Sequence, residues 1–201
     1  MSIVFPNGPT PQDDEHAVAS LIRADKRHPG RTHVFKCVNT DIPDEEPFHQ
    51  VVGVSFWKIF KHERSEEDLK REEEEEERDL AEYGRPPTMI VDGIAAFQKT
   101  YSGYRKKHLG NRPFILLHVL ATRAEFARQG VGAMSLQWGI EKSDELGLPI
   151  WLEGSPQGVG LYKKFGFEVL DTLPWDARDY GYHEPLTHLC MMRQPAKKPE
   201  R

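Results

Sequence analysis

The pattern of apolar and polar residues is dominated by one stretch, residues 114–133, which reads FILLHVLATRAEFARQGVGA. Its first part, 114–122, is almost entirely apolar, and a short charged loop follows. An apolar run of this length, bounded by turn residues, predicts a strand that is buried on both faces. Residues 134–146 then mix apolar and charged positions as an amphipathic helix does, and Gly147 is suited to end it. A second buried strand is predicted over 148–153, followed by a short helix.

The remaining segments supply further helices and strands around this centre. Acidic residues in the first turn and basic residues in the last turn suit the dipole of a helix at the start of the chain. Gly84 and the prolines after it are expected to end a charged helix. The predicted elements are, in order, a helix over 13–26, strands over 33–38 and 50–60, a charged helix within 61–80, an amphipathic helix over 88–107, and strands over 167–170 and 187–192.

Length and charge narrow the classes of function. The 201 residues suffice for a single domain, predicted over 1–196, with a disordered tail at 197–201. The net charge of −5 disfavours nucleic-acid binding. No apolar run is long enough for a membrane span, and the first residues lack the pattern of a signal peptide. Cys37 and Cys190 form no disulfide framework, so the sequence predicts reduced thiols and a cytoplasmic location.

Two glycines mark the point where the central strand and its loop lead into a helix. Gly130 and Gly132 leave the first backbone amides of that helix uncovered by side chains. These amides and the positive end of the helix dipole predict an anion site. A Gly-x-Gly turn is weak evidence by itself, because glycines stand near helix starts in many folds.

A second motif at the expected distance makes the pattern specific. The order strand, R-Q-G-V-G-A, helix, strand and L-Y-K-K-F-G-F resembles the GNAT superfamily of acyl-CoA-dependent N-acyltransferases. The resemblance is strongest over 114–170. It also implies that 61–111, before the central strand, is a helical insertion like that of larger fungal members. In the family's phosphate motif, Q/R-x-x-G-x-G/A, Gly130 and Gly132 fill both glycine positions, whereas Ala127 replaces the leading Gln or Arg.

The resemblance implies an α/β fold, α+β by some schemes. Its sheet is mixed and mostly antiparallel, is flanked by helices, and contains a central parallel pair of strands that splay apart. The family usually opens with a strand and a helix before the helix expected at 13–26, and this chain has too few residues for them. Their absence predicts an uncovered sheet edge around Val34. The protein is expected to be a monomer or a homodimer.

The resemblance also implies a co-substrate, acetyl-CoA, and a reaction, acetyl transfer to an amine of a small molecule or a protein, without a metal. The opened strand pair would take the pantetheine arm, and the glycine turn the pyrophosphate. The N–H of Leu120 would donate to the thioester oxygen, where negative charge grows in the transition state. The predicted acetyl-CoA contacts are Leu120, Thr122, Arg128, Gln129, Gly130, Val131, Gly132, Ala133 and Ser155.

Three residues are candidates for proton transfer. Tyr162 matches the family's tyrosine that protonates the leaving thiolate, and the alternative is a packing tyrosine. Some relatives carry a glutamate base on the central strand, where this chain has Leu116. His118 lies two residues on, hence on the same face, and Glu153 ends the second strand. Either is able to accept the amine's proton, directly or through water, and the alternative for His118 is a buried core histidine.

Other interpretations remain open at this point. The missing first elements, Ala127 and Leu116 also fit a non-catalytic GNAT-fold module that binds CoA or another protein. The acidic segment 61–80 is a solvated helix, an acidic rim that attracts cationic substrates, or a scaffold for a basic partner. The aromatic stripe of 88–107 packs on the sheet or forms the wall of an acceptor pocket. The sequence selects neither the acceptor nor N- over O-acylation.

Overall fold

The computed structural model describes residues 10–43, 45, 49–89, 91–174, 176–180 and 187–196. The chain divides into two compact units, which are described separately. The helical unit comprises Met1–Pro29, His62–Arg112 and Thr172–His188, and the sheet unit comprises Gly30–Lys61, Pro113–Asp171 and Leu189–Arg201. The predicted tail at 197–201 lies outside the described residues.

The sheet has six strands, in the order β1-β2-β3-β4-β6-β5. Neighbouring strands run antiparallel at β1–β2, β2–β3 and β4–β6, and parallel at β3–β4. The prediction of a mixed sheet with a parallel pair at its centre is therefore confirmed. The strands are β1 (Thr32–Val38), β2 (Val51–Phe60), β3 (Phe114–Thr122), β4 (Ile150–Gly154), β5 (Glu168–Thr172) and β6 (Leu189–Arg193).

The parallel pair is joined over a short distance only. Its register covers Ile115 and Leu116 on β3, opposite Ile150 and Trp151 on β4. Beyond this point β3 continues to Thr122 and remains paired with β2 alone. Just after β3 separates from β4, the register between β2 and β3 shifts. Phe56 pairs with Val119 and Trp57 pairs with Leu117, so His118 of β3 is an extra residue without a partner position on β2. A β-bulge of this kind bends its strand and ends regular pairing.

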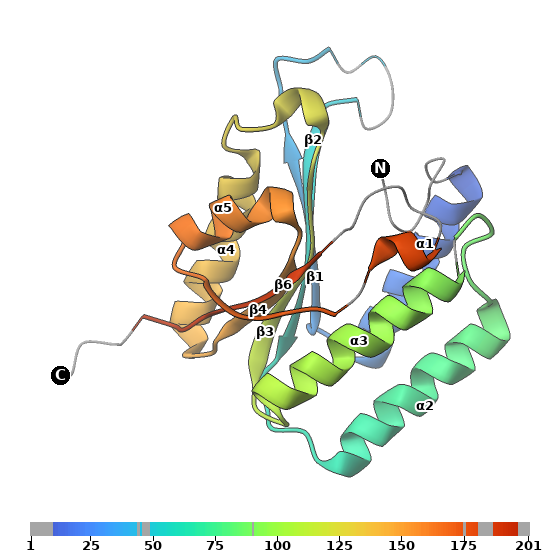
Figure 1. Cartoon of the computed structure of the whole chain (residues 1–201). Coiled ribbons are helices and arrows are strands. Elements are labelled where there is room, and N and C mark those ends of the chain that lie inside the picture. Colours follow the sequence, from blue (N-terminus) through green and yellow to red (C-terminus); the bar gives the residue numbers. More distant parts are fainter. Residues whose placement is uncertain are drawn as a thin grey trace. The chain divides into compact units, whose positions relative to one another are not determined.

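Two helices cover one face of this sheet, α4 (Val131–Leu146) and α5 (Pro156–Lys164) (Figure 1). Close packing at Trp57 fixes the position of α4, because a Cβ on Gly139 would overlap the indole ring. The core between helices and sheet consists of Trp57, Ile59, Ile115, Leu117, Leu136, Ile150, Leu152, Tyr162, Phe167 and Met191.

The central strand is buried only in its first half. Residues 114–117 are buried, whereas His118, Val119 and Ala121 are exposed. The prediction that 114–122 is buried on both faces is thus wrong for the second half, because the bulge and the end of the β3–β4 pairing leave that half without close neighbours on one side. The exposed half is the part that was predicted to bind acetyl-CoA.

The helical unit contains α1 (Pro11–Arg27), α2 (Glu66–Tyr83), α3 (Val91–Leu109) and a short 3₁₀ turn, Ala177–Tyr180. Asp13 caps α1 in a capping box with Thr10 and also accepts hydrogen bonds from the backbone N–H and hydroxyl of Thr88 (3.0 and 2.6 Å). Burial alone raises the pKa of Asp13, but hydrogen bonds from Thr10 and Thr88 outweigh it and hold the pKa well below its usual range. The carboxylate joins the start of α1 to the segment before α3.

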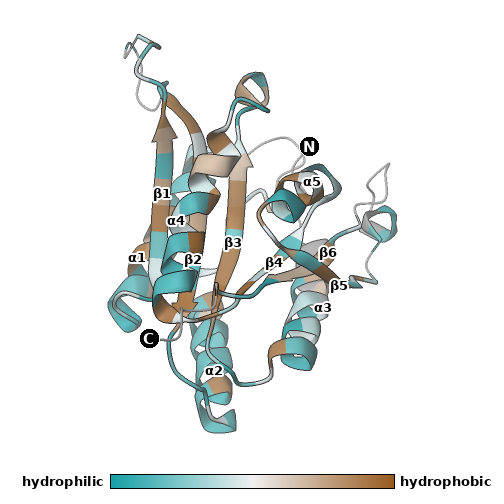
Figure 2. Cartoon of the chain, turned by 90° about the vertical axis from the view of Figure 1, so that its left-hand side faces the viewer, coloured by the Kyte–Doolittle hydropathy of each residue, from teal (hydrophilic) through white to brown (hydrophobic). Residues whose placement is uncertain are grey.

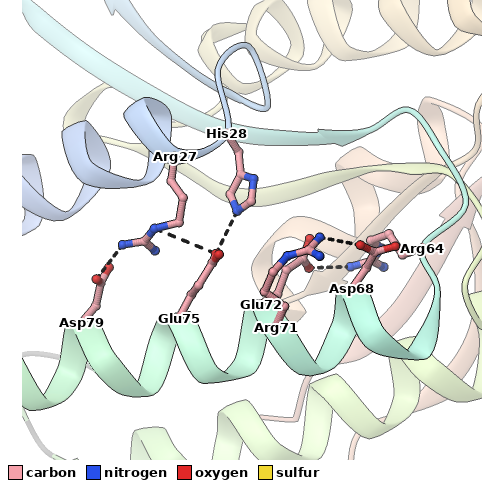
Figure 3. A network of polar contacts seen from close by, with 8 residues as sticks. All are labelled: Arg27, His28, Arg64, Asp68, Arg71, Glu72, Glu75 and Asp79. Atoms are coloured by element: carbon pink, nitrogen blue, oxygen red, sulfur yellow. Dashed lines mark hydrogen bonds and ion pairs between the residues drawn. The ribbon is translucent and has the colours of Figure 1, made fainter.

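The charged helix α2 is mostly hydrophilic (Figure 2). Its two sides differ in the contacts that their side chains make. On its inner side Arg27 contacts Asp79 (2.6 Å), His28 contacts Glu75 (3.2 Å), and Arg64 contacts Glu72 (3.2 Å) (Figure 3). On its outer side the glutamates are exposed, and Lys70 and Glu74 form an i,i+4 pair (3.7 Å). The interpretation as a solvated helix therefore describes the outer side only.

Two further sequence predictions concern absences. Cys37 is half-buried, Cys190 is buried, and both are free thiols. In the part of the chain that the structure describes, no helix is both long and apolar enough to cross a membrane.

Candidate functional site

The first turn of α4 is the most distinctive feature of the sheet unit. Gly130 caps this helix in the left-handed conformation (φ +92°), which disfavours any residue with a Cβ. No side chain caps the helix, and its first turn contains no acidic residue. The first amides of α4 consequently point outward with the positive end of the helix dipole behind them, the arrangement that binds anions.

Glycines also bring this turn close to its surroundings. A Cβ on Gly132 would lie 2.9 Å from Leu161 Cδ2, so α5 packs directly against the backbone there. A Cβ on Gly53 of β2 would lie 2.5 Å from Val131 Cγ1. Gly53 was not among the predicted site residues, although a glycine inside a strand pattern is a signal of close backbone approach. At Gly53 and Gly132 the backbone is thus in close contact with its neighbours, and a side chain at either position would occupy that space.

The loop before the turn is braced by hydrogen bonds. Gln129 Nε2 donates to the carbonyl oxygen of Glu125 (2.8 Å), and Arg123 contacts Glu125 and the His49 carbonyl (2.5 and 2.8 Å). Arg128 has a positive φ of 62° and an exposed side chain. Of the two predicted loop contacts, Arg128 presents a cation beside the turn, whereas the side chain of Gln129 is bonded within the loop.

The outer half of β3 lies alongside this turn. Leu120 and Thr122 pair with Ser55 and Gly53 of β2 and share the face that α4 covers. Leu120 packs against the core, and a Cβ on Gly132 would lie 3.9 Å from its Cδ2. Since β3 leaves β4 after Leu116, the backbone edge of this half borders the opening between the two strands.

Tyr162 lies on α5, below the end of β4. The residue is 8% exposed, and the centroid of its ring lies 5.9 Å from the centroid of the Phe167 ring. Gly154 and Gly158 make room for it, because a Cβ on either would approach the ring to 3.2 or 2.6 Å. Burial raises the pKa of Tyr162 to about 12, so the phenol is protonated at neutral pH and is able to donate.

Ser155 stands between β4 and α5. Its backbone carbonyl accepts from the amides of Gly158 and Val159 (2.9 and 3.2 Å) and so begins the helix. Its hydroxyl makes no capping hydrogen bond. The hydroxyl is therefore available at the end of β4, where it was predicted to contact CoA.

Glu153 and His118 lie on the opposite face of the sheet. The indole N–H of Trp151 donates to Glu153 Oε1 (2.6 Å), and Trp151 shares its face with its partner on β3, Leu116. The His118 ring meets Phe56 edge to face, with centroids 5.0 Å apart. His118 is exposed, so it is not the buried core histidine of the alternative interpretation.

The predicted residues therefore form two groups around the opened strand pair. Tyr162, Leu120 and the first turn of α4 lie on the helix-covered face, whereas Glu153 and His118 lie on the other. Tyr162 on one face is a potential hydrogen-bond donor, and Glu153 and His118 on the other face are potential proton acceptors.

The sequence of this chain matches a known protein family. A model of the "Acetyltransferase (GNAT) family" matches residues 54–167. The chain is 35% identical over 43 residues to "Probable acyltransferase SID5" of Ajellomyces capsulatus, an alignment that covers 21% of this chain and 32% of that protein. The match thus spans about a third of the curated relative's length.

Solved structures share the fold at low identity. Mosquito arylalkylamine N-acetyltransferase like 5b superimposes with a TM-score of 0.56 at 16% identity, covering 96% of this chain and 85% of that one. Arabidopsis thaliana NAA60, solved with a bisubstrate analogue, gives a TM-score of 0.52 at 12% identity, covering 96% and 98%. At these identities the likeness concerns the fold alone.

Proposed function

Because the chain belongs to the acetyltransferase (GNAT) family, we propose that it transfers the acetyl group of acetyl-CoA to an amine of a small molecule or a protein. The observation that carries this proposal is the start of α4, where a left-handed Gly130 and an uncapped first turn present backbone amides beside Arg128. Members of this family use acyl-CoA as co-substrate. The pyrophosphate of acetyl-CoA fits the charge and the bare backbone of this turn.

The other predicted contacts follow the opening between β3 and β4. The backbone of β3 from Leu117 to Thr122 borders this opening and offers amide and carbonyl groups to the pantetheine arm. Ser155 offers a hydroxyl at the end of β4. The N–H of Leu120 is proposed to donate to the thioester oxygen as negative charge grows there. Acetyl-CoA supplies the activated acetyl group, and these residues orient it.

Tyr162 is proposed to donate a hydrogen bond to the departing sulfur. A thiol has a pKa of about 8.5, well below the value of about 12 to which burial raises the pKa of Tyr162. The thiolate is therefore too weak a base to take the phenolic proton outright, and Tyr162 stabilises it chiefly as a hydrogen-bond donor. The acceptor's proton leaves on the other face, to Glu153 or His118.

The edge strand β1 bears on how this chain differs from the usual pattern of the family. In the described part of the chain, β1 pairs with β2 only and ends the sheet. We propose that no strand of the described residues takes the place of the family's opening strand at this edge, and that 61–111, which holds α2 and α3, is a helical insertion into one acetyltransferase domain.

A second candidate function is a module of this fold that binds CoA or a protein without catalysis. It is favoured by Ala127 in the leading position of the phosphate motif and by the bond that holds the Gln129 side chain to Glu125. Both features reduce the number of side chains offered to a pyrophosphate. Turnover of acetyl-CoA in the presence of an amine separates the two candidates.

The test uses a matched pair of glycine variants. Gly130 and Gly110 both have a positive φ (92° and 57°) and open space at the Cβ position, so Gly130→Glu and Gly110→Glu add similar strain and the same charge. Acetyl-CoA binding is measured by calorimetry, and CoA release is measured with a thiol reagent across a panel of amines. We expect Gly130→Glu to abolish both and Gly110→Glu to retain both. Equal behaviour of the two variants contradicts the placement of the co-substrate.

A further inference from the structure

The structure holds Glu153 in place through a neighbour on the same strand. Trp151 is fully buried and occupies the last position of β4 that pairs with β3, opposite Leu116. Glu153 lies two residues further along, past the point where β3 and β4 part, on the same face. The Trp151 indole N–H donates to Glu153 Oε1 over 2.6 Å. The carboxylate is thus drawn back toward the site of strand separation.

Loss of this hydrogen bond is expected to be energetically unfavourable. A buried indole N–H without an acceptor is unfavourable, and tryptophan N–H groups in protein interiors usually find a partner. An ionised carboxylate is a stronger acceptor than a neutral group. Breaking the bond would cost the N–H this acceptor, so conformations of the Glu153 side chain that preserve the bond are favoured.

A comparable pair of residues lies on the other face of the sheet. Trp57 of β2 is also fully buried and donates its indole N–H to the hydroxyl of Ser55, two residues away on the same strand (3.1 Å). Trp57 packs in the core against α4, opposite Leu117. The two tryptophans therefore share burial, strand context and hydrogen-bond spacing, and they differ in the acceptor.

We propose that Trp151 is a positioning residue, which holds the Glu153 carboxylate at the β3–β4 separation so that Glu153 receives the proton of the acceptor amine. This inference rests on the proposed acetyl transfer. The carboxylate takes one proton from the ammonium group, the nitrogen then bonds to the acetyl carbon while the carbon–sulfur bond breaks, and the second nitrogen-bound proton is released to the CoA sulfur. The products are the amide, free CoA and the protonated Glu153 carboxyl group, which account for the acetyl group and for both protons.

Orientation by a third group is the usual way in which a catalytic base is kept ready. A general base contributes at least about 100-fold to turnover, and a displacement of about 1 Å is able to remove a similar factor. We therefore expect Trp151→Phe to lower kcat by about 10- to 100-fold while the KM for acetyl-CoA stays unchanged. Benzothienylalanine at position 151 keeps the bicyclic shape without the N–H, and we expect it to lower kcat in the same way if the phenylalanine variant folds poorly.

The decisive measurement is a double-mutant cycle on kcat. Because Trp151 acts through Glu153, Trp151→Phe should cause no further loss in the Glu153→Gln background. Trp57→Phe, the matched control, should show no coupling to Glu153, so its effect on kcat should be the same with Glu153 and with Gln at position 153. A structural role alone predicts that the losses at 151 and 153 multiply, and that result overturns the inference.

NMR spectroscopy tests this hydrogen bond independently of enzyme activity. The chain has four tryptophans, so its indole N–H groups give a small set of ¹H–¹⁵N resonances, and Trp151→Phe and Trp57→Phe identify two of them. Glu153→Ala should shift the Trp151 resonance and leave that of Trp57 in place. An unmoved Trp151 resonance overturns the inference. A wild-type protein that binds acetyl-CoA but acetylates no amine overturns the proposed function and this inference with it, whereas missing coupling in an active enzyme overturns the inference alone.

Discussion

Replacing Gly53 by alanine tests how β2 supports the start of α4. A Cβ at position 53 would lie 2.5 Å from Val131 Cγ1 and 3.1 Å from the carbonyl oxygen of Ala121. Ordinary carbon–carbon contacts are about 3.5–4.0 Å, so the valine methyl has to retreat by about 1 Å. Val131 is buried, β-branched and the first residue of a helix, so its side chain has few alternative rotamers. The movement therefore passes to the backbone of residues 131–133.

The expected magnitude follows from this overlap. Overpacking of this kind costs about 1–3 kcal/mol. At about 2–4 °C per kcal/mol for a chain of this length, Tm should fall by about 2–12 °C. Because the shifted amides are those assigned to the pyrophosphate, we expect the Kd for acetyl-CoA to rise about tenfold, equivalent to about 1.4 kcal/mol. Calorimetry measures the affinity, and thermal unfolding without ligand measures the stability.

The control removes the atom that causes the clash. Val131→Ala deletes Cγ1 and by itself loses about 1.6 kcal/mol for two buried methyl groups. In the double variant Gly53→Ala/Val131→Ala the new methyl group occupies the vacated space, so the affinity for acetyl-CoA should recover toward that of Val131→Ala alone. If the double variant instead shows the sum of the two losses, or if Gly53→Ala binds acetyl-CoA normally, the reasoning about this contact is refuted.

Three further predictions concern Tyr162 and Asp13. Tyr162→Phe keeps the buried ring and removes only the donor, so kcat should fall by about 10- to 100-fold while Tm stays close to that of the wild type; full turnover would show that Tyr162 only packs. Because burial raises the pKa of Tyr162 to about 12, the wild-type enzyme should show no loss of activity from this group between pH 6 and about pH 10. The pKa of Asp13 is lowered in the folded state, so its carboxylate contributes stability above the unfolded value of about 3.9 and loses that contribution as the pH falls toward the folded value. The Tm advantage of the wild type over Asp13→Asn should be full at pH 6 and shrink below about pH 4, and a constant difference down to pH 2 would contradict the assignment.

Periodicity was sufficient to locate the main elements. The apolar run at 114–122 is β3, and the helix after the glycine turn is α4, which ends at Gly147 in the left-handed conformation. These segments are long, strongly patterned and bounded by turn residues, so local sequence determines them. The second central strand begins at Ile150 rather than residue 148, because the Leu148 amide still bonds to Ser143 at the end of α4.

The bulge at His118 was beyond the reach of sequence reasoning. An unbroken apolar run gives no sign that one strand carries an extra residue relative to its neighbour. That extra residue depends on how β2 and β3 align, a non-local property. Its consequences, an exposed His118 and the shared face of Leu117 and Leu120, are therefore visible only in the folded chain.

The site was predicted as a set of residues but not as two faces. Trp151 and Glu153 lie two residues apart on β4 and so share a side, but the hydrogen bond between them depends on side-chain rotamers. Likewise, Gly53 stands inside the strand predicted over 50–60, but its contact with Val131 requires the packing of α4 on the sheet. Both features arise from tertiary packing, which local patterns do not encode.

The central claim is that acetyl-CoA binds at the first turn of α4, and thermal unfolding with and without acetyl-CoA tests it most directly. Ligand at about 100 times its Kd adds about 2.7 kcal/mol to the free energy of unfolding. For a chain of this length that corresponds to a rise in Tm of about 5–10 °C. We predict this rise for the wild type and for Gly110→Glu, and none for Gly130→Glu. A cooperative transition that acetyl-CoA leaves unmoved in the wild type, or a full rise in Gly130→Glu, would contradict the account.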